Sequence, residues 1–401
     1  MSIKAPLRLK LSGKQLHFKV MKSVVLYAYP PQPDGLSMQG DMLYRGMKEN
    51  GEETLPSHLA SDFQKEWIYN NFKPDVAYSI GYWNYTPDVI LHPQKFGVTP
   101  VPWFVADGWV ANYQKEIGSL PLVLVTSEWV KKTYARDGVD TKNFEVAHIG
   151  LETEIFKPIP KSDPRIKTVR QMLGVEDNEL MIMTAGGDVS SKGAQEILQA
   201  LKKIDQEFKN WKYILKVWGG ESADDHWPDE QQLIAELGES ASKVKYIEGS
   251  LSADFMPYLL NACDIYAAPS RLEGYGMIQV EAQGCGKPVI SINEMGPKET
   301  IVHGKTGFLA NIASTVDLTE EWVYKDMGYD EDKKIEFEKP KTFAYRANVD
   351  ELAEYLHKLL TDDKLREDMS RAAREHAVQN FEYHKIAKYI TDLTKERLKL
   401  N

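Results

Sequence analysis

The amino-acid sequence predicts an α/β protein built from two successive doubly wound, Rossmann-like domains. Its 401 residues are too many for one ordinary hydrophobic core. Short apolar segments alternate with helical ones, which is typical of parallel strands covered by helices on both faces. The alternation stops at a proline-containing connector, residues 157–160, and then begins again. This restart indicates a second domain of the same type.

The first domain is expected over residues 1–155. Continuous apolar segments predict its strands at residues 23–29, 75–80, 101–105 and 122–125. The turn after the first strand contains Gly35 and Gly40, and we expect a helix to begin near Asp41. Two interpretations of this turn remain open: its glycines border a bound diphosphate, or it is an ordinary strand-to-helix loop.

The second domain is expected over residues 156–375. Its predicted strands are residues 180–185, 213–218, 244–247, 265–268 and 288–291, with an amphipathic helix over 195–208. Residues 314–346 are charge-rich and are interpreted as an insertion on this domain. From Asp350 onward there is no proline, and the apolar spacing is helical throughout. The final part, residues 376–401, is expected to be a helix that packs back toward the first domain.

Charge and composition exclude several classes of protein. The net charge of -10 disfavours general nucleic-acid binding, which needs a basic face. No apolar run approaches the roughly 18–20 residues that span a bilayer, and the start of the chain lacks the pattern of a signal peptide. Cys263 and Cys285 are too few for a disulfide framework, so a cytoplasmic location is expected.

The start of the chain is basic. Six lysines and arginines precede Asp34, the first acidic residue. Residues 7–20 alternate apolar and polar side chains around Ser12 and Gly13, which predicts a short hairpin. This hairpin either covers a sheet edge, with lysines that prevent aggregation, or offers a surface to anionic lipid or an anionic acceptor.

The most informative segment is a strand, a glycine-containing loop and a helix, residues 265–283. The first amides of a helix are unpaired and its dipole favours an anion, while Gly274 and Gly276 allow the backbone to approach a phosphate closely. Glu273 lies in the loop and Glu281 more than a turn into the helix, so both carboxylates can face one crevice. Carboxylates accept hydrogen bonds from sugar hydroxyls.

Residues 270–282 resemble the E-x7-E signature of retaining GT-B glycosyltransferases, specifically glycosyltransferase family 4. Residues 150–158, 284–290, 296–299 and 304–307 resemble the same family in the same order. The resemblance covers most of residues 120–395, with the insertion as a gap. It implies a GT-B fold, in which two Rossmann-like domains face a central cleft and helices end the chain.

The resemblance also implies roles for particular residues. Glu281 would bind the ribose of a nucleotide-sugar, Glu273 would contact the transferred sugar or its phosphate end, and Lys192 would bind phosphate. The backbone at Gly276, Met277 and Ile278 would hold the diphosphate. Further donor contacts are expected from Gly274, Tyr275, Gly187, Arg271, Tyr246, Ile247 and Gly35.

Two positions depart from the family pattern. Relatives usually have an arginine about five residues before the lysine, where this chain has Gly187, so that cation is missing or is supplied by Arg271 or another residue. Many relatives also have a catalytic histidine after the third or fourth strand. Asp107 stands at roughly that place, and it either orients the acceptor hydroxyl or caps the following helix.

The resemblance implies a retaining, metal-independent hexosyltransferase that works on one face of the sugar. Apart from the nucleotide-sugar co-substrate, no cofactor is expected. The acceptor is a carbohydrate, a lipid-linked group, a protein or a small molecule, and the basic hairpin would serve for any membrane association. Two alternatives remain: a GT-B sugar phosphorylase, and a non-catalytic protein that binds nucleotide-sugars.

Overall fold

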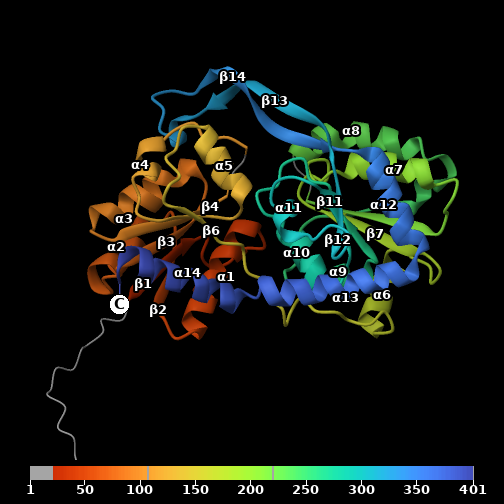
Figure 1. Ribbon diagram of the computed structural model, residues 1–401, viewed down its shortest axis with the longest axis horizontal. Helices are drawn as coiled ribbons and strands as arrows, with labels where there is room; N and C mark the ends of the chain where they lie inside the picture. Colours follow the sequence, from red (N-terminus) through yellow and green to blue (C-terminus); the bar gives the residue numbers. More distant parts are fainter. Residues whose placement is uncertain (1–20, 106–107, 219–220, 401) are drawn as a thin grey trace, which may run out of the picture.

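The computed structural model describes residues 21–105, 108–218 and 221–400, which form two α/β domains side by side (Figure 1). The sheet of the first domain has the strand order β2-β1-β3-β4-β5-β6, and all neighbouring strands are parallel. Its strands are β1 (Lys22–Tyr27), β2 (Glu53–His58), β3 (Val76–Gly81), β4 (Thr99–Phe104), β5 (Val123–Val125) and β6 (Phe144–Val146). Its helices are α1 (Gly35–Glu49), α2 (Asp62–Asn71), α3 (His92–Lys95), α4 (Gln114–Gly118) and α5 (Glu128–Arg136).

The second domain repeats this architecture with the strand order β12-β11-β10-β7-β8-β9, again with all neighbouring strands parallel. Its strands are β7 (Leu180–Ala185), β8 (Trp211–Val217), β9 (Val244–Glu248), β10 (Ile265–Ala267), β11 (Val289–Ile292) and β12 (Gly307–Ala310). Its helices are α6 (Pro164–Met172), α7 (Ala194–Ile204), α8 (Glu221–Ala235), α9 (Met256–Ala262), α10 (Met277–Gly284), α11 (Pro297–Thr300) and α12 (Val349–Thr361).

Each sheet has one point where the strand order reverses, between β1 and β3 in the first and between β7 and β10 in the second. The central strands are buried on both faces; every residue of β3, for example, is buried. This burial explains why their sequences are continuously apolar rather than alternating. The two-domain α/β fold expected from the sequence is confirmed.

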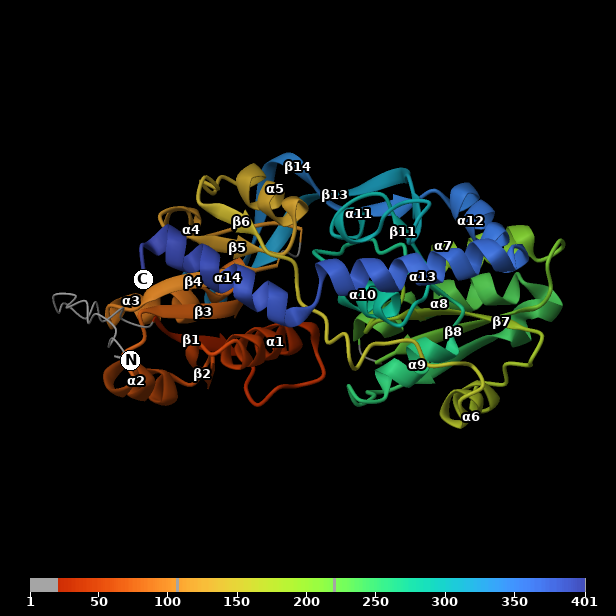
Figure 2. The ribbon, with the colours of Figure 1, turned by 60° about the horizontal axis from the view of Figure 1, so that its bottom comes forward.

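The chain passes between the domains twice, and the two passages lie side by side. The first is the connector that contains Leu151, and the second joins α13 (Asp363–Asn380) to α14 (Tyr383–Leu398). The amide of Tyr383 donates to the carbonyl oxygen of Leu151 at 3.1 Å. Figure 2 shows α13 along the second domain and α14 on the first, where it lies against α1.

Residues interpreted as an insertion form a long antiparallel hairpin of β13 (Ile312–Val323) and β14 (Lys333–Ala347). The hairpin leaves the second domain and crosses to the first on the side opposite α13 and α14 (Figure 1). There the hydroxyl of Tyr329 donates to the carbonyl oxygen of Ala111 at 2.9 Å, and the ammonium of Lys341 lies 3.1 Å from the carboxylate of Asp137. These contacts fasten the hairpin to the first domain.

Two expected boundaries are wrong. Helix α1 begins at Gly35, not near Asp41, because the carboxylate of Asp34 accepts the amide of Ser37 at 2.9 Å and caps the helix. The C-terminal helical stretch is also interrupted, at Asp362 and at residues 381–382. The basic hairpin expected within residues 7–20 lies outside the described residues. Within the described part of the chain, no helix is both long and apolar enough to cross a membrane.

Candidate active site

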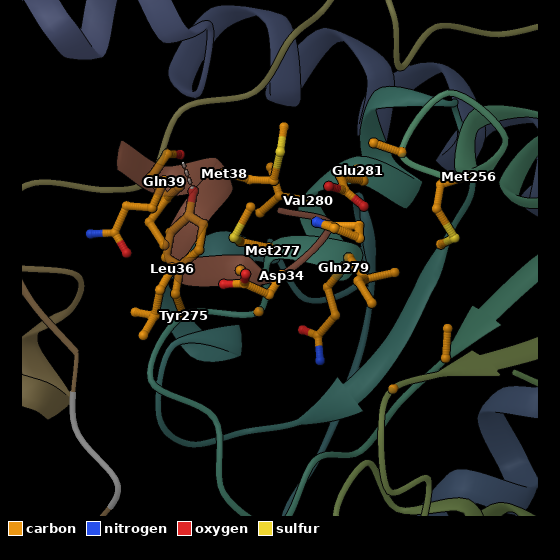
Figure 3. Close-up of a pocket in the computed structure, with 18 of the residues that line it drawn as sticks. Asp34, Leu36, Met38, Gln39, Met256, Tyr275, Met277, Gln279, Val280 and Glu281 are labelled. Atoms are coloured by element: carbon orange, nitrogen blue, oxygen red, sulfur yellow. Dashed lines mark hydrogen bonds between the residues drawn. The ribbon is translucent and has the colours of Figure 1, made fainter. Parts of the chain in front are cut away.

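A cavity of about 700 Å³ lies between the domains. Its walls include the loops that follow β1 and β3 in the first domain and β7 and β10 in the second. These are the carboxyl ends of the strands next to both reversal points, where doubly wound sheets bind ligands. Figure 3 shows Asp34, Leu36 and Met38 of the first domain close to Met277 and Glu281 of the second. The volume suits a ligand the size of a nucleotide-sugar.

The start of α10 is built around Gly276. This residue has a φ of +96°, a conformation that glycine adopts readily, and it precedes the first helical residue, Met277. A Cβ atom at Gly276 would lie 3.0 Å from the Oε1 atom of Gln279. The first amides of the helix, at Met277 and Ile278, have no partner inside it and border the cavity. This helix start can therefore bind an anionic group.

Lys192 and Glu273 meet inside the cavity. The ammonium of Lys192 donates to the Oε2 atom of Glu273 at 2.6 Å, and the hydroxyl of Ser270 donates to the same oxygen at 3.4 Å. Lys192 comes from the turn after β7 and Glu273 from the loop after β10, and these strands are neighbours in the sheet. The structure thus brings together the two charged residues that the sequence places 81 positions apart.

Glu281 is half-buried in the cavity wall, and no hydrogen-bond donor reaches its carboxylate from the described residues. Burial, helped by the negative charge of Glu152, raises the pKa of Glu281 to about 8. Glu152 also lines the cavity and is itself paired with Arg45 at 2.8 Å. A carboxyl group in this state is suited to a ligand that offers it hydroxyl donors.

The loop between Glu273 and Gly276 also joins the domains. The hydroxyl of Ser127 donates to the carbonyl oxygen of Gly274 at 2.8 Å. The buried Tyr275 donates its hydroxyl to the carbonyl oxygen of Ile149 at 2.7 Å. These bonds fix the loop against the first domain. Gly274 and Tyr275 thus line the cavity and hold Glu273 and Gly276, on either side of them, in place.

Several predicted residues do not border the cavity. Arg271 is buried against α7, where its guanidinium contacts Glu196 at 3.0 Å and Gln195 at 2.8 Å. Tyr246 donates its hydroxyl to Glu230 at 2.7 Å, and Ile247 is partly buried and packs against the core. The loop that follows β9, from Ser250 to Met256, borders the cavity instead of β9 itself. Asp107 lies outside the described residues.

Gly35 and Gly187 do line the cavity. At Gly35, a Cβ atom would lie 3.5 Å from the sulfur of Met277, so the starts of α1 and α10 are close neighbours. Gly187 is covered by Trp218, whose Cε3 atom would lie 3.1 Å from a Cβ there. Gly40 does not line the cavity, and a Cβ atom built there would meet the side chain of Tyr27.

Sequence reasoning missed several cavity residues, among them Lys216, Trp218 and Gln39. Lys216 interrupts an apolar strand, and a charge in a buried strand is a signal that could have identified it. Gln39 is 1% exposed, and neither polar atom of its amide has a partner among the described residues. No group of three or more metal-ligating side chains occurs in the described ranges.

Sequence comparison shows which known proteins this chain is similar to. Residues 165–321 match the family model for glycosyl transferases of group 1. Alpha-maltose-1-phosphate synthase of Mycobacterium tuberculosis is 24% identical over 256 residues, which are 64% of this chain and 57% of that protein. D-inositol 3-phosphate glycosyltransferase of Mycobacterium bovis is 27% identical over 191 residues, 47% of this chain and 37% of that protein. The chain therefore spans just over half of the first relative's length and over a third of the second's.

Solved structures share the whole fold. Anabaena Alr3699/HepE, crystallised with UDP and glucose, has a TM-score of 0.68 and 18% identity, covering 94% of this chain and 100% of that one. Sucrose-phosphate synthase from Thermosynechococcus elongatus has a TM-score of 0.71 and 14% identity, covering 95% and 100%. The chain thus has the two-domain GT-B fold, and its second domain is similar in sequence to glycosyl transferases of group 1.

Proposed function

We propose that the protein is a retaining glycosyltransferase, which transfers a hexosyl group from a nucleoside-diphosphate sugar to an acceptor hydroxyl without a metal ion. The observation that carries this proposal is the Lys192–Glu273 pair beside the open start of α10, in a cavity that both domains line. The names of the similar proteins and the ligands of the Anabaena structure support the same reaction class.

In this proposal the donor lies along the second domain. Its ribose hydroxyls donate to Glu281, and its diphosphate accepts from the amides at the start of α10 and from Lys192. Glu273 holds a hydroxyl of the sugar. Because Lys192 touches Glu273, one network links the leaving diphosphate to the transferred sugar.

The chemistry proceeds on one face of the sugar. As the bond between the anomeric carbon and the diphosphate oxygen breaks, the helix start and Lys192 stabilise the charge that develops on the diphosphate. The acceptor oxygen forms its bond on the same face, and the leaving phosphate takes the acceptor proton. The acceptor enters from the first domain, where Asp107 orients its hydroxyl.

A thermal-shift series with UDP, GDP, ADP, TDP and CDP, with and without EDTA, tests donor binding. One diphosphate should raise the melting temperature, and EDTA should not change the shift. Incubation with the matching nucleotide-sugar and a panel of acceptors should then give a product whose anomeric configuration equals that of the donor, as determined by NMR. No binding of any diphosphate, or an inverted product, would contradict the proposal.

A further inference from the structure

Lys216 differs from the other deeply buried lysine of the described chain. It is the penultimate residue of β8 and is 6% exposed. No carboxylate lies within ion-pair distance of its ammonium, and no described group accepts a hydrogen bond from it. Lys65, which is 0% exposed, pairs with Asp62 at 3.0 Å and Asp88 at 3.4 Å. The charge of Lys65 is thus compensated by two carboxylates at the surface, whereas no described carboxylate pairs with Lys216.

The strand register places Lys216 at the same part of the cavity as the turn that carries Lys192. Lys216 is opposite Ala185, the last residue of β7. The amide of Gly186 donates to the carbonyl oxygen of Lys216 at 3.1 Å. Ala185, Gly186, Lys192 and Lys216 all line the cavity. Two neighbouring strands therefore each bring one cation to it.

Trp218 holds the Lys216 ammonium in place. The Nζ atom lies 5.0 Å from the centre of the indole ring, within the range of a cation–π contact. The same ring covers Gly187 and occupies the space that a longer side chain there would need. A cation at position 187 would compete with this arrangement. The Lys216 ammonium therefore lies on the same indole ring that covers Gly187.

The pairing of the two cavity lysines indicates what Lys216 binds. Lys192 and Lys216 are the two cations among the described lining residues, and Lys192 is already paired with Glu273. Burial lowers the pKa of Lys216, as expected for an ammonium without a counter-ion. A phosphate group of the ligand beside Lys216 would supply the counter-charge that no described side chain offers it.

We propose that Lys216, held by Trp218, is a second diphosphate-binding cation of the donor site, in addition to Lys192. This inference rests on the proposed function, because it requires a nucleoside-diphosphate donor. It assigns to Lys216 the recognition of the diphosphate, not of the base or the sugar.

The test replaces Lys216 by methionine and measures the affinities of UDP, GDP, ADP, TDP and CDP and of the five matching nucleosides. The diphosphate that binds the unaltered protein should bind Lys216→Met at least tenfold more weakly, while its nucleoside should change less than twofold. Lys216→Arg, which restores the charge, should recover affinity to within about threefold. Lys212→Met is the matched control, because Lys212 lies at the other end of β8 and does not line the cavity; its affinities should not change.

Folding can be separated from binding in the same experiment. Lys216→Met should keep or raise the melting temperature, because it removes a buried uncompensated charge. Lys216→Gln, which keeps a polar tip without the charge, should lose diphosphate affinity in the same way. An unchanged diphosphate affinity, or an equal loss for the nucleoside, would overturn the assignment of Lys216. If the unaltered protein binds none of the five diphosphates, the proposed function fails first, and the assignment fails with it.

Discussion

Replacing Glu281 by glutamine keeps the size of the side chain and removes its titration, so the variant isolates the effect of the half-buried carboxylate. Burial and the charge of Glu152 raise the pKa of Glu281 from 4.5 to about 8. At about 1.4 kcal/mol per pH unit, the ionised form is roughly 5 kcal/mol less favourable in the folded protein than in the unfolded chain. This value is an upper bound, because the side chain is not fully buried.

The sign of the pH dependence follows from which state holds the proton more tightly. The folded protein does, so the contribution of Glu281 to the free energy of unfolding is complete below about pH 4.5 and is lost as the pH rises to about 8. Near pH 4.5, ligand-free Glu281→Gln should have the same free energy of unfolding as the unaltered protein. Above pH 8, the free energy of unfolding of the variant should be higher by several kcal/mol. Urea denaturation across this range measures the difference.

Binding should reverse the effect, because ribose hydroxyls that donate to Glu281 favour its ionised form. Nucleotide binding at about pH 7 should therefore release a proton, which calorimetry in buffers of different ionisation enthalpy detects. Glu281→Gln should bind several-fold more weakly, as should Glu281→Ala, and release no proton from this site. Equal proton release by the variant, or a stability difference that does not change with pH, would refute the reasoning.

Three other substitutions test single features of the site. Gly276→Ala puts a Cβ atom 3.0 Å from Gln279 at a φ of +96°. The free energy of unfolding should therefore fall by about 1–2 kcal/mol, and calorimetry should show weaker nucleotide binding. Unchanged values would mean that α10 tolerates a side chain here. Gln39→Leu removes a buried amide without partners, so the melting temperature should rise by about 1–3 °C; a decrease would reveal a partner that the fold needs. Asp107→Asn should reduce transfer but leave donor affinity unchanged in parallel assays, whereas full activity would make Asp107 a helix cap.

The sequence predicted the second domain better than the first. The boundaries of β7 were exact, because a continuous apolar strand followed by Gly186 has few other interpretations. β2 was missed because its sequence is mostly polar and lacks the continuous apolar run of the other strands; the structure places it at the edge of the sheet. The β13–β14 hairpin was recognised only as charge-rich, because most of its side chains are exposed and its strands lack a buried face.

The candidate site divides in the same way. Glu273, Gly276 and Glu281 are close in sequence, so local motif reasoning placed them correctly around the start of α10. Arg271 was misjudged because its partner Glu196 lies 75 positions away and draws the guanidinium into the core. Lys216 was missed for the opposite reason: its place in the cavity depends on the pairing of β8 with β7, and strand order cannot be read from a local pattern.

The β13–β14 hairpin limits how far the two domains can separate to let a ligand enter or leave the cavity between them. The paired passages at Leu151 and Tyr383 hold the domains together on one side, while the hairpin grips residues near Ala111 and Asp137 on the other. If the domains were joined only at these passages, they could separate by a hinge rotation about them. Here a rotation about the paired passages pulls directly on the hairpin, so wide opening requires the Tyr329 and Lys341 contacts to break. We therefore expect the free energy needed to separate the domains to depend on these hairpin contacts rather than on bending of the connector.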